Sequence, residues 1–176
     1  PEEYGRFHSP REVVSNLEKT AKKYGTCKCR ISGGEPTLCR KHLLNVLKII
    51  EENEWFNLFI LETNGILFGA DKGYVEELLP FRKIHIRVSL KAGNGEEFQR
   101  RTGALGEHYE LPFKAIRNLY EAKISFHVAA ITDSRIMREE EKREIITRLS
   151  EIDEEIAKNL EEEVIDPYNT TLFRLR

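Results

Sequence analysis

Short stretches of apolar and β-branched residues alternate in this sequence with longer stretches of helical periodicity. We expect strands at 27–32, 57–65, 83–91, 123–132 and, at the end, 162–168. Between them we expect helices at 10–24, 39–53, 72–79, 111–122 and 138–152. Strands separated by helices of this length are joined by right-handed crossovers and pair in parallel. The sequence therefore predicts an α/β fold with a parallel sheet.

The composition is typical of one packed domain. The chain has 176 residues, of which 40% are hydrophobic and 33% charged, and its net charge is -2. Basic and acidic residues are interspersed, so no broad cationic surface favours nucleic acid or an anionic membrane. The sequence has neither an apolar run of about 18 residues, as a membrane span needs, nor a secretory leader. We predict a single cytoplasmic domain over residues 1–176.

An acidic tract at 151–163 could be an interaction tail or the exposed side of a helix. Ile152, Ile156 and Leu160 recur within it every four residues. That period favours a helix with a solvated acidic face.

Charged side chains occupy every second position in parts of the predicted sheet. In the strand at 27–32, Lys28 and Arg30 share one face, opposite Cys27, Cys29 and Ile31. In the strand at 83–91, His85, Arg87, Ser89 and Lys91 alternate with apolar residues, and the strand at 123–132 repeats the pattern with Ser125 and His127. Parallel strands that are covered on both faces are normally apolar throughout. These strands must therefore have one polar face.

Two architectures explain a polar face. An incomplete, splayed barrel could present it to an anionic ligand through Lys28, Arg30, Arg87, Lys91 and His127. An antiparallel α+β sheet with one wet face is the alternative. The helices between the strands favour the barrel.

The segment SGGEP, residues 32–36, follows the second of the chain's predicted elements, at the carboxyl end of a strand. Ligands of open α/β folds bind at these strand ends. Gly33 and Gly34 let a ligand approach the backbone, and the carboxylate of Glu35 could receive an ammonium group. A purely structural strand-to-helix turn also uses glycine and proline, and remains open on spacing alone.

The next two strands also end in polar residues. ETNG places Thr63 and Asn64 at the end of the strand at 57–65, and Ser89 and Lys91 end the strand at 83–91. Because the carboxyl ends of parallel strands share one edge of a sheet, these residues indicate a site.

Four segments in this order, SGGEPTL, ETNG, SLKAGNGEEFQRRTG and FHVAAIT, resemble the radical S-adenosylmethionine (radical SAM) superfamily. Within it they look most like the pyruvate formate-lyase activating enzymes, which activate glycyl radical enzymes. The resemblance implies a partial (β/α)6 TIM-like barrel that holds a [4Fe-4S] cluster and SAM. In such enzymes the reduced cluster cleaves SAM to methionine and a 5'-deoxyadenosyl radical, which abstracts hydrogen from the substrate.

The same resemblance implies roles for individual residues. Gly33, Gly34 and Glu35 would hold the methionyl amino group of SAM, and Thr63 and Asn64 would line its pocket. Ser89 and Lys91 would approach the ribose and the carboxylate of SAM, and His127 would face the same cavity. It also implies a small-molecule or protein substrate, bound with help from Lys28, Arg30 and Arg87, and a reductant such as flavodoxin or ferredoxin.

The chain departs from the family pattern in three places. The cluster motif Cys-x3-Cys-x2-Cys is absent, so we expect it, with the first barrel strand, before Pro1. This core alone is then expected to bind SAM weakly and to catalyse nothing. The activases usually carry an acid at the position of Ser89 and an arginine at that of His127.

The three cysteines do not replace the missing motif. Cys27, Cys29 and Cys39 have the spacing C-x-C-x9-C. Same-face neighbours on a strand lie about 6.5 Å apart, which is awkward for two thiolates on one metal. We predict core packing for Cys27 and Cys29, and leave Cys39, near a helix start, open.

Two other functions remain at this point. A Schiff-base barrel enzyme would use Lys91 as its nucleophile, activated by neighbouring Arg87. A noncatalytic barrel would bind an anionic ligand or a partner through Lys28, Arg30 and Arg87.

Overall fold

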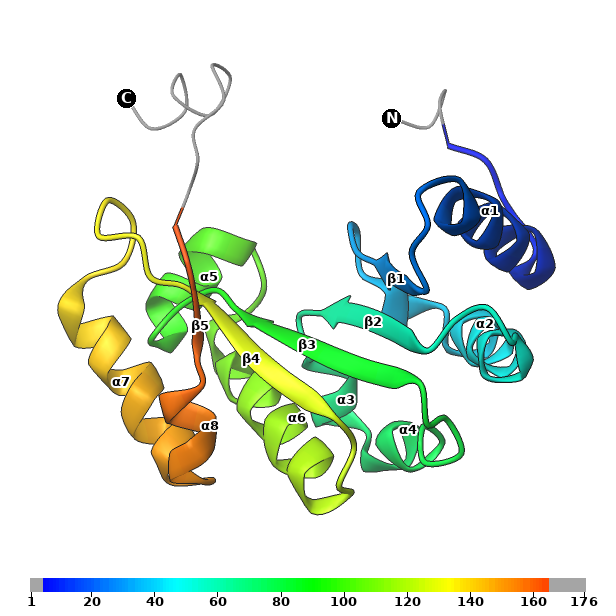
Figure 1. Cartoon of the computed structure of the whole chain (residues 1–176). Coiled ribbons are helices and arrows are strands. Elements are labelled where there is room, and N and C mark those ends of the chain that lie inside the picture. The colour runs from blue at the N-terminus through cyan, green and yellow to red at the C-terminus, as the bar shows by residue number, and fades with distance from the viewer. Residues whose placement is uncertain (1–4, 165–176) are drawn as a thin grey trace. The chain divides into compact units, whose positions relative to one another are not determined.

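The computed structural model describes residues 5–164 and divides them into two compact units. Unit 1 comprises the described residues up to Val88 together with Glu110–His127. It contains α1 (Pro10–Lys23), β1 (Lys28–Ile31), the 3-10 helix η1 (Pro36–Leu38), α2 (Arg40–Glu52), β2 (Leu58–Thr63), α3 (Ile66–Ala70), α4 (Lys72–Glu76), most of β3 (Ile84–Leu90) and α6 (Glu110–Glu121) (Figure 1).

Unit 2 comprises Ser89–Tyr109 and the described residues from Val128 onward. It contains α5 (Gly95–Thr102), the 3-10 helix η2 (Gly106–Tyr109), most of β4 (Phe126–Ile131), α7 (Glu139–Ser150), α8 (Glu154–Lys158) and β5 (Glu161–Glu163). Whether residues 1–176 act as one domain stays a prediction. Among the described helices, none is long and apolar enough to cross a membrane.

The sheet is parallel at each pairing that the structure defines. In unit 1, β1 pairs with β2 and β2 with β3, so that Arg30 lies opposite Ile60 and Ile60 opposite His85. The backbone N–H of Ile86 donates to the carbonyl oxygen of Ser125 (2.9 Å), just before β4. In unit 2, β4 pairs with β5. The strands are thus neighbours in chain order, which confirms the α/β class and shows that the antiparallel alternative was wrong.

The two faces of β2 differ in burial as the alternation predicts, with Phe59 and Leu61 buried. In β3 the apolar residues Ile84, Ile86 and Val88 are buried, but Arg87 and Ser89 on the polar face are buried too, so that only His85 is partly exposed. In unit 1 the helices α3, α4 and α6 lie on one side of these strands (Figure 1). The apolar face therefore packs against helices, and the charged side chains lie on the opposite face.

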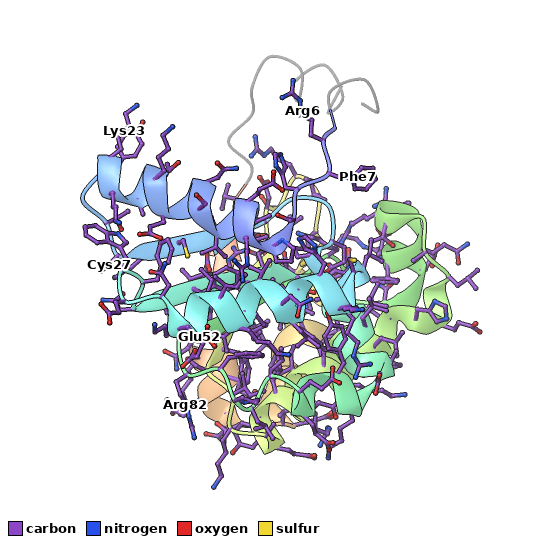
Figure 2. All side chains as sticks on the ribbon, turned by 90° about the vertical axis from the view of Figure 1, so that its right-hand side faces the viewer. Arg6, Phe7, Lys23, Cys27, Glu52 and Arg82 are labelled. Atoms are coloured by element: carbon purple, nitrogen blue, oxygen red, sulfur yellow. The ribbon has the colours of Figure 1, made fainter. Side chains whose placement is uncertain are left out.

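Helix α1 begins at the predicted residue because its first turn is capped. Ser9 accepts a hydrogen bond from the Glu12 N–H, and the Glu12 carboxylate accepts one from the Ser9 N–H (2.7 Å). Figure 2 shows α1 and α2 side by side, with their C-terminal ends, marked by Lys23 and Glu52, on the same side. That arrangement is expected when each helix leads into one of two parallel strands, as α1 leads into β1 and α2 into β2.

Two parts of the prediction differ from the structure in unit 2. The segment between β3 and α6 was predicted as a loop, but it contains α5, which Asn94 caps by accepting from the Glu97 N–H. A helix of eight residues that begins at Gly95 is too short for a clear periodic signal.

The acidic tract at 151–163 is only partly helical. Its helix is α8, and Glu161–Glu163 form β5 instead. Pairing with β4 overrides the local helical pattern there. Of the strand predicted at 162–168, the described residues show only the beginning, and residues 165–168 lie outside them.

The loop after β3 is held by a buried ion pair. Arg101 on α5 donates to the Lys91 carbonyl oxygen (3.1 Å) and to both carboxylate oxygens of Glu141 on α7 (2.9 Å each). Glu141 also accepts from the Gly93 N–H (3.2 Å), and the Tyr109 hydroxyl donates to the Gly93 carbonyl oxygen (2.7 Å). Loop, α5 and α7 are thereby fixed to one another within unit 2.

Candidate functional site

Glu35 joins the ends of β1 and β2 through its carboxylate. Its Oε1 accepts from the Thr63 hydroxyl (2.7 Å), the Thr37 hydroxyl (2.6 Å) and the Thr37 N–H (3.1 Å). Its Oε2 accepts from the N–H of Asn64 (2.8 Å). The structure therefore brings Glu35, Thr63 and Asn64 together, as the two motifs at neighbouring strand ends predict.

Oε2 keeps room for a further donor. A carboxylate oxygen has two lone pairs, and Asn64 is the single donor to Oε2 among the described residues. The three hydrogen bonds to Oε1 hold the group in place. A charged, oriented oxygen of this kind suits an ammonium group.

Gly33 and Gly34 leave the backbone beside Glu35 open. Both have positive φ, +87° and +58°, which favours glycine, and no atom lies within 4 Å of the position that a Cβ would take at either. Both glycines are exposed to solvent. Carbonyl oxygens in this turn can thus be approached from outside.

Two buried residues, Thr37 and Tyr74, support the turn that carries Glu35. Burial raises the pKa of Tyr74 to about 12, so that its hydroxyl stays protonated, and it donates to the Thr37 carbonyl oxygen (3.2 Å). The guanidinium of Arg40 lies over the Tyr74 ring, 4.6 Å from its centre. Thr37 is itself buried and bound to Glu35. Tyr74 therefore holds the segment that orients the Glu35 carboxylate.

The turn after β2 admits only glycine at its tip. Gly65 has φ +77°, and a Cβ there would lie 3.1 Å from Val88 Cγ1 and 3.3 Å from Ala115 Cβ. The Asn64 side chain accepts from the Ile66 N–H (2.9 Å) and so starts α3. Asn64 thus serves the fold with its side chain and Glu35 with its backbone.

Ser89 and Lys91 form a second group, which belongs to unit 2. The Lys91 ammonium donates to the Ser89 hydroxyl (2.6 Å) and lies 3.9 Å from the Glu163 carboxylate. The structure brings these two predicted residues together. Their relation to the Glu35 group stays a prediction, because the two groups lie in different units.

A charged cluster occupies the polar face of unit 1. Arg87 donates to Glu62 Oε1 (2.6 Å), and Arg30 donates to Oε2 through Nε (3.0 Å) and also through Nη2. We call Arg30, Glu62 and Arg87 the arginine–glutamate cluster. Lys28 is exposed on the same face, opposite Leu58. The face is therefore cationic overall but contains one carboxylate.

Sequence reasoning missed Glu62. Its position in ETNG was visible, and it stands two residues after Ile60, on the face that carries Arg30. The signal that could have identified Glu62 was the presence of an acidic residue on a face predicted to be cationic. Its partnership with both arginines depends on the register between three strands, which a sequence pattern does not specify.

His85 and His127 form a hydrogen-bonded pair on the same face. His85 Nε2 lies 2.7 Å from His127 Nδ1, and His85 Nδ1 lies 2.7 Å from the Ser125 hydroxyl. Burial, and secondarily the neighbouring His127, lower the pKa of His85. His127 thus faces the side that was predicted for it, with a histidine partner that was predicted only to share the face.

The cysteines of the described residues do not fit an iron–sulfur cluster. No group of three or more His, Cys, Asp or Glu side chains in residues 5–164 is placed to hold a metal. Burial raises the pKa of Cys29 to about 11, so it is a thiol, whereas a metal binds the thiolate. Cys27 and Cys29 are half-buried and Cys39 is exposed. The described cysteines therefore do not fit the cluster, and SAM binding by Gly33, Gly34 and Glu35 stays a prediction.

The sequence model of the Radical SAM superfamily matches residues 1–134. The probable GTP 3',8-cyclase of Methanococcus aeolicus is 30% identical over 188 residues, which cover 96% of this chain and 60% of that protein. The GTP 3',8-cyclase of Syntrophomonas wolfei is 32% identical over 120 residues, 66% of this chain and 36% of the relative. The chain thus spans 60% or less of the length of these curated relatives.

A solved structure has the same fold. Streptococcus suis SuiB bound to S-adenosylmethionine matches with a TM-score of 0.63 at 22% identity, over 97% of this chain and 40% of SuiB. At this identity the likeness concerns the fold. It confirms that the parallel sheet is that of a partial TIM-like barrel.

Proposed function

The chain belongs to the radical SAM superfamily, and from this premise we propose that it is the SAM-binding core of a radical SAM enzyme. The observation that carries the proposal is the carboxylate of Glu35, which ties the Gly-Gly-Glu-Pro turn to the end of β2. The family implies SAM and a [4Fe-4S] cluster as cofactors. When bound, they supply the one-electron reductive cleavage of SAM and the abstraction of hydrogen from a substrate.

The residues of the first group bind the methionine part of SAM in this proposal. Glu35 Oε2 and the open backbone of Gly33 and Gly34 receive the ammonium group. Thr63 and Asn64 keep the carboxylate of Glu35 in place, and so set the position of that ammonium. Their contribution is orientation rather than chemistry.

The other predicted contacts complete the proposed SAM site. Lys91 and Ser89 supply an ammonium and a hydroxyl, which suit the carboxylate and the ribose of SAM. His127 faces the same ligand in the proposal. The cluster ligands are proposed to come from cysteines outside the described residues, because those within them do not fit. The electron that reduces the cluster would come from a flavodoxin or ferredoxin.

The substrate in this proposal is anionic. Among the described residues, Lys28, Arg30 and Arg87 give the polar face three positive charges, and Glu62 is the carboxylate that pairs with the two arginines. The curated relatives reported above are named for a reaction of GTP, so GTP is the first substrate to test. Activation of a glycyl radical enzyme, the finer prediction from the sequence, is the alternative, and would show as a protein-based radical on an added partner.

The test uses the full-length gene product, reconstituted anaerobically with iron and sulfide. We expect it to cleave SAM to 5'-deoxyadenosine when reduced. Glu35→Ala should weaken SAM binding by at least about tenfold, since it removes a charge-assisted hydrogen bond and the hub of the turn. Glu54→Ala, at an exposed residue outside the site, is the matched control.

Two results would overturn the proposal. Unchanged SAM affinity in Glu35→Ala would remove the role of the carboxylate, and absence of 5'-deoxyadenosine from the reconstituted protein would remove the enzymatic claim. Borohydride trapping of a carbonyl compound on Lys91 would support the Schiff-base enzyme instead. Binding of an anion without any iron uptake would support the noncatalytic barrel.

A further inference from the structure

We propose that the His85–His127 pair couples the binding of an anion on the polar face of unit 1 to the uptake of one proton. The inference rests on the proposed substrate face, and adds that the site takes a dianionic group, such as a phosphate monoester or inorganic sulfate, together with a proton. The group that takes up the proton is the histidine pair, and the arginines only attract the anion.

The two imidazoles meet edge to edge. Their ring planes differ by 18° and their centres are 4.9 Å apart, whereas His85 Nε2 and His127 Nδ1 are separated by 2.7 Å. A face-to-face stack would hold those nitrogens about as far apart as the ring centres. The rings are therefore close to coplanar, with one proton between the two nitrogens.

This arrangement is ready to accept a second proton. Neutral His85 can make both of its hydrogen bonds in either tautomer, because the Ser125 hydroxyl can donate to Nδ1 or accept from it. Protonated His85 donates from both nitrogens, to Ser125 and to His127, with no change in geometry. The cation is thus solvated in advance by its two partners.

The pair lies in one row with Arg30. Arg30 is opposite Ile60, Ile60 is opposite His85, and His127 is bonded to His85, all on the same face. Two strand spacings separate Arg30 from His85, about 10 Å between their Cα atoms. The Arg30 guanidinium now contacts Glu62, two residues beyond Ile60; if a bound anion displaces that carboxylate, the long Arg30 side chain can hold the anion above Ile60, beside the imidazoles.

The surroundings of the pair favour its neutral form when no anion is bound. The charged groups that neighbour it on β1, β2, β3 and the segment before β4 are Lys28, Arg30, Lys83, Arg87, Lys123 and the carboxylate of Glu62. Lys83 is turned away, since its ammonium donates to carbonyl oxygens at the end of α2. Burial and His127 lower the pKa of His85. Among the described residues this set has five cationic side chains and one carboxylate, and a bound dianion adds negative charge to it.

Linkage fixes the sign of the effect. If an anion favours the protonated pair, protonation favours the anion by the same factor. Anion affinity then rises as the pH falls through the titration of the pair, and saturating anion shifts that titration to higher pH. Without coupling, affinity is flat over the same range.

The experiment uses sulfate as the probe, at constant ionic strength made up with chloride. Sulfate stays a dianion over about pH 5.5 to 8, where histidine titrates, so its own charge adds no pH dependence. We expect its affinity for the chain to fall about tenfold from about pH 6 to about pH 8. Side-chain ¹⁵N NMR of His85 should show its titration midpoint rising by about one pH unit at saturating sulfate.

Variants assign the two halves of the effect. His127→Asn should keep sulfate binding but reduce its pH dependence to less than about twofold. Arg30→Met should abolish sulfate binding while the pair still titrates. His108→Asn, at an exposed histidine of unit 2, should match the wild type. Should His127→Asn fail to fold by circular dichroism, the wild-type midpoint shift and Arg30→Met decide the question.

The outcomes separate this inference from the function on which it rests. Sulfate binding that is independent of pH in the wild type overturns the coupling and leaves the anionic substrate face standing. No sulfate binding at any pH overturns both. SAM binding and cleavage test the proposed cofactor site independently of either result.

Discussion

The two networks of arginine and glutamate in this protein use the same residue types for different ends. In the Arg101–Glu141 pair of unit 2, the side chains are 12% and 2% exposed, and both also bind backbone groups, Lys91, Ile136 and Gly93 among them. In the arginine–glutamate cluster of unit 1, Arg30 is 49% exposed and Glu62 21%, whereas Arg87 is only 5% exposed. The first network joins pieces of backbone, whereas the second joins side chains and includes the exposed guanidinium of Arg30.

The difference teaches how to distinguish a structural ion pair from one that is available to a ligand. Burial makes the loss of one partner expensive, because the other charge cannot be hydrated. Backbone partners make the pair part of the fold. An exposed guanidinium whose partner is one carboxylate can exchange it for a ligand anion at little cost.

The largest effect is expected from breaking the buried pair. Glu141→Ala leaves Arg101 buried beside a cavity with Glu97, at 3.1 Å, as its remaining carboxylate partner, and should lower the free energy of unfolding by about 3 kcal/mol, the lower end for a broken buried pair. Urea denaturation followed by circular dichroism measures it. Glu141→Gln, which keeps the shape and one acceptor oxygen, should cost less. A loss below about 1 kcal/mol for Glu141→Ala would place this pair with ordinary surface ion pairs.

Glu62→Gln should separate stability from binding. The variant loses the charge that both arginines share, but its amide oxygen can still accept from the buried Arg87, so we expect the free energy of unfolding to fall by about 1–3 kcal/mol. Sulfate affinity should rise several-fold, because the carboxylate no longer competes for Arg30. Isothermal titration calorimetry measures the sulfate affinity. Glu141→Gln, in the other network, should show no increase in this affinity. Weaker sulfate binding in Glu62→Gln would contradict the view that the cluster is available.

A smaller effect should appear in acid. Burial raises the pKa of Glu141, but hydrogen bonds from Arg101 and from the N–H groups of Gly93 and Arg138 outweigh it, so the pKa lies below the usual 4.5. A group with a lowered pKa stabilises the fold above its unfolded pKa and loses this contribution as the pH falls through the folded one. The stability gap between wild type and Glu141→Gln should therefore narrow below about pH 4.5. A gap that stays constant down to about pH 3 would show that Glu141 does not titrate there.

Part of the fold and site could be predicted because local patterns determine them. The Ser9–Glu12 capping box, the alternation in β3 and the glycines after β1 each leave a signal within a few residues. Glu35 was predicted to bind a ligand, and its hub with Thr63 and Asn64 follows from two motifs at adjacent strand ends.

The remainder depends on contacts between distant residues. The edge-to-edge bond of His85 and His127 joins positions 42 residues apart, and the buried pair joins Arg101 to Glu141 over 40 residues. Nothing in either local sequence distinguishes a buried charge from a solvated one. The strand predicted at 162–168 begins at Glu161 for the same reason, since pairing with β4 outweighs the acidic, helix-like pattern of the tract before it.

The smallest effect is expected from a largely exposed ion pair, which is the reference for the two networks of arginine and glutamate. Arg143 and Glu140 on α7 form an ion pair at 3.2 Å, but their side chains are 71% and 74% exposed. Water and salt screen such a pair, and ordering two long side chains offsets most of its attraction. Arg143→Ala should therefore change the melting temperature by no more than about 2 °C and leave sulfate affinity unchanged. If Arg143→Ala lowered the melting temperature as much as Glu141→Ala, on the same helix, burial could not be what separates structural ion pairs from available ones.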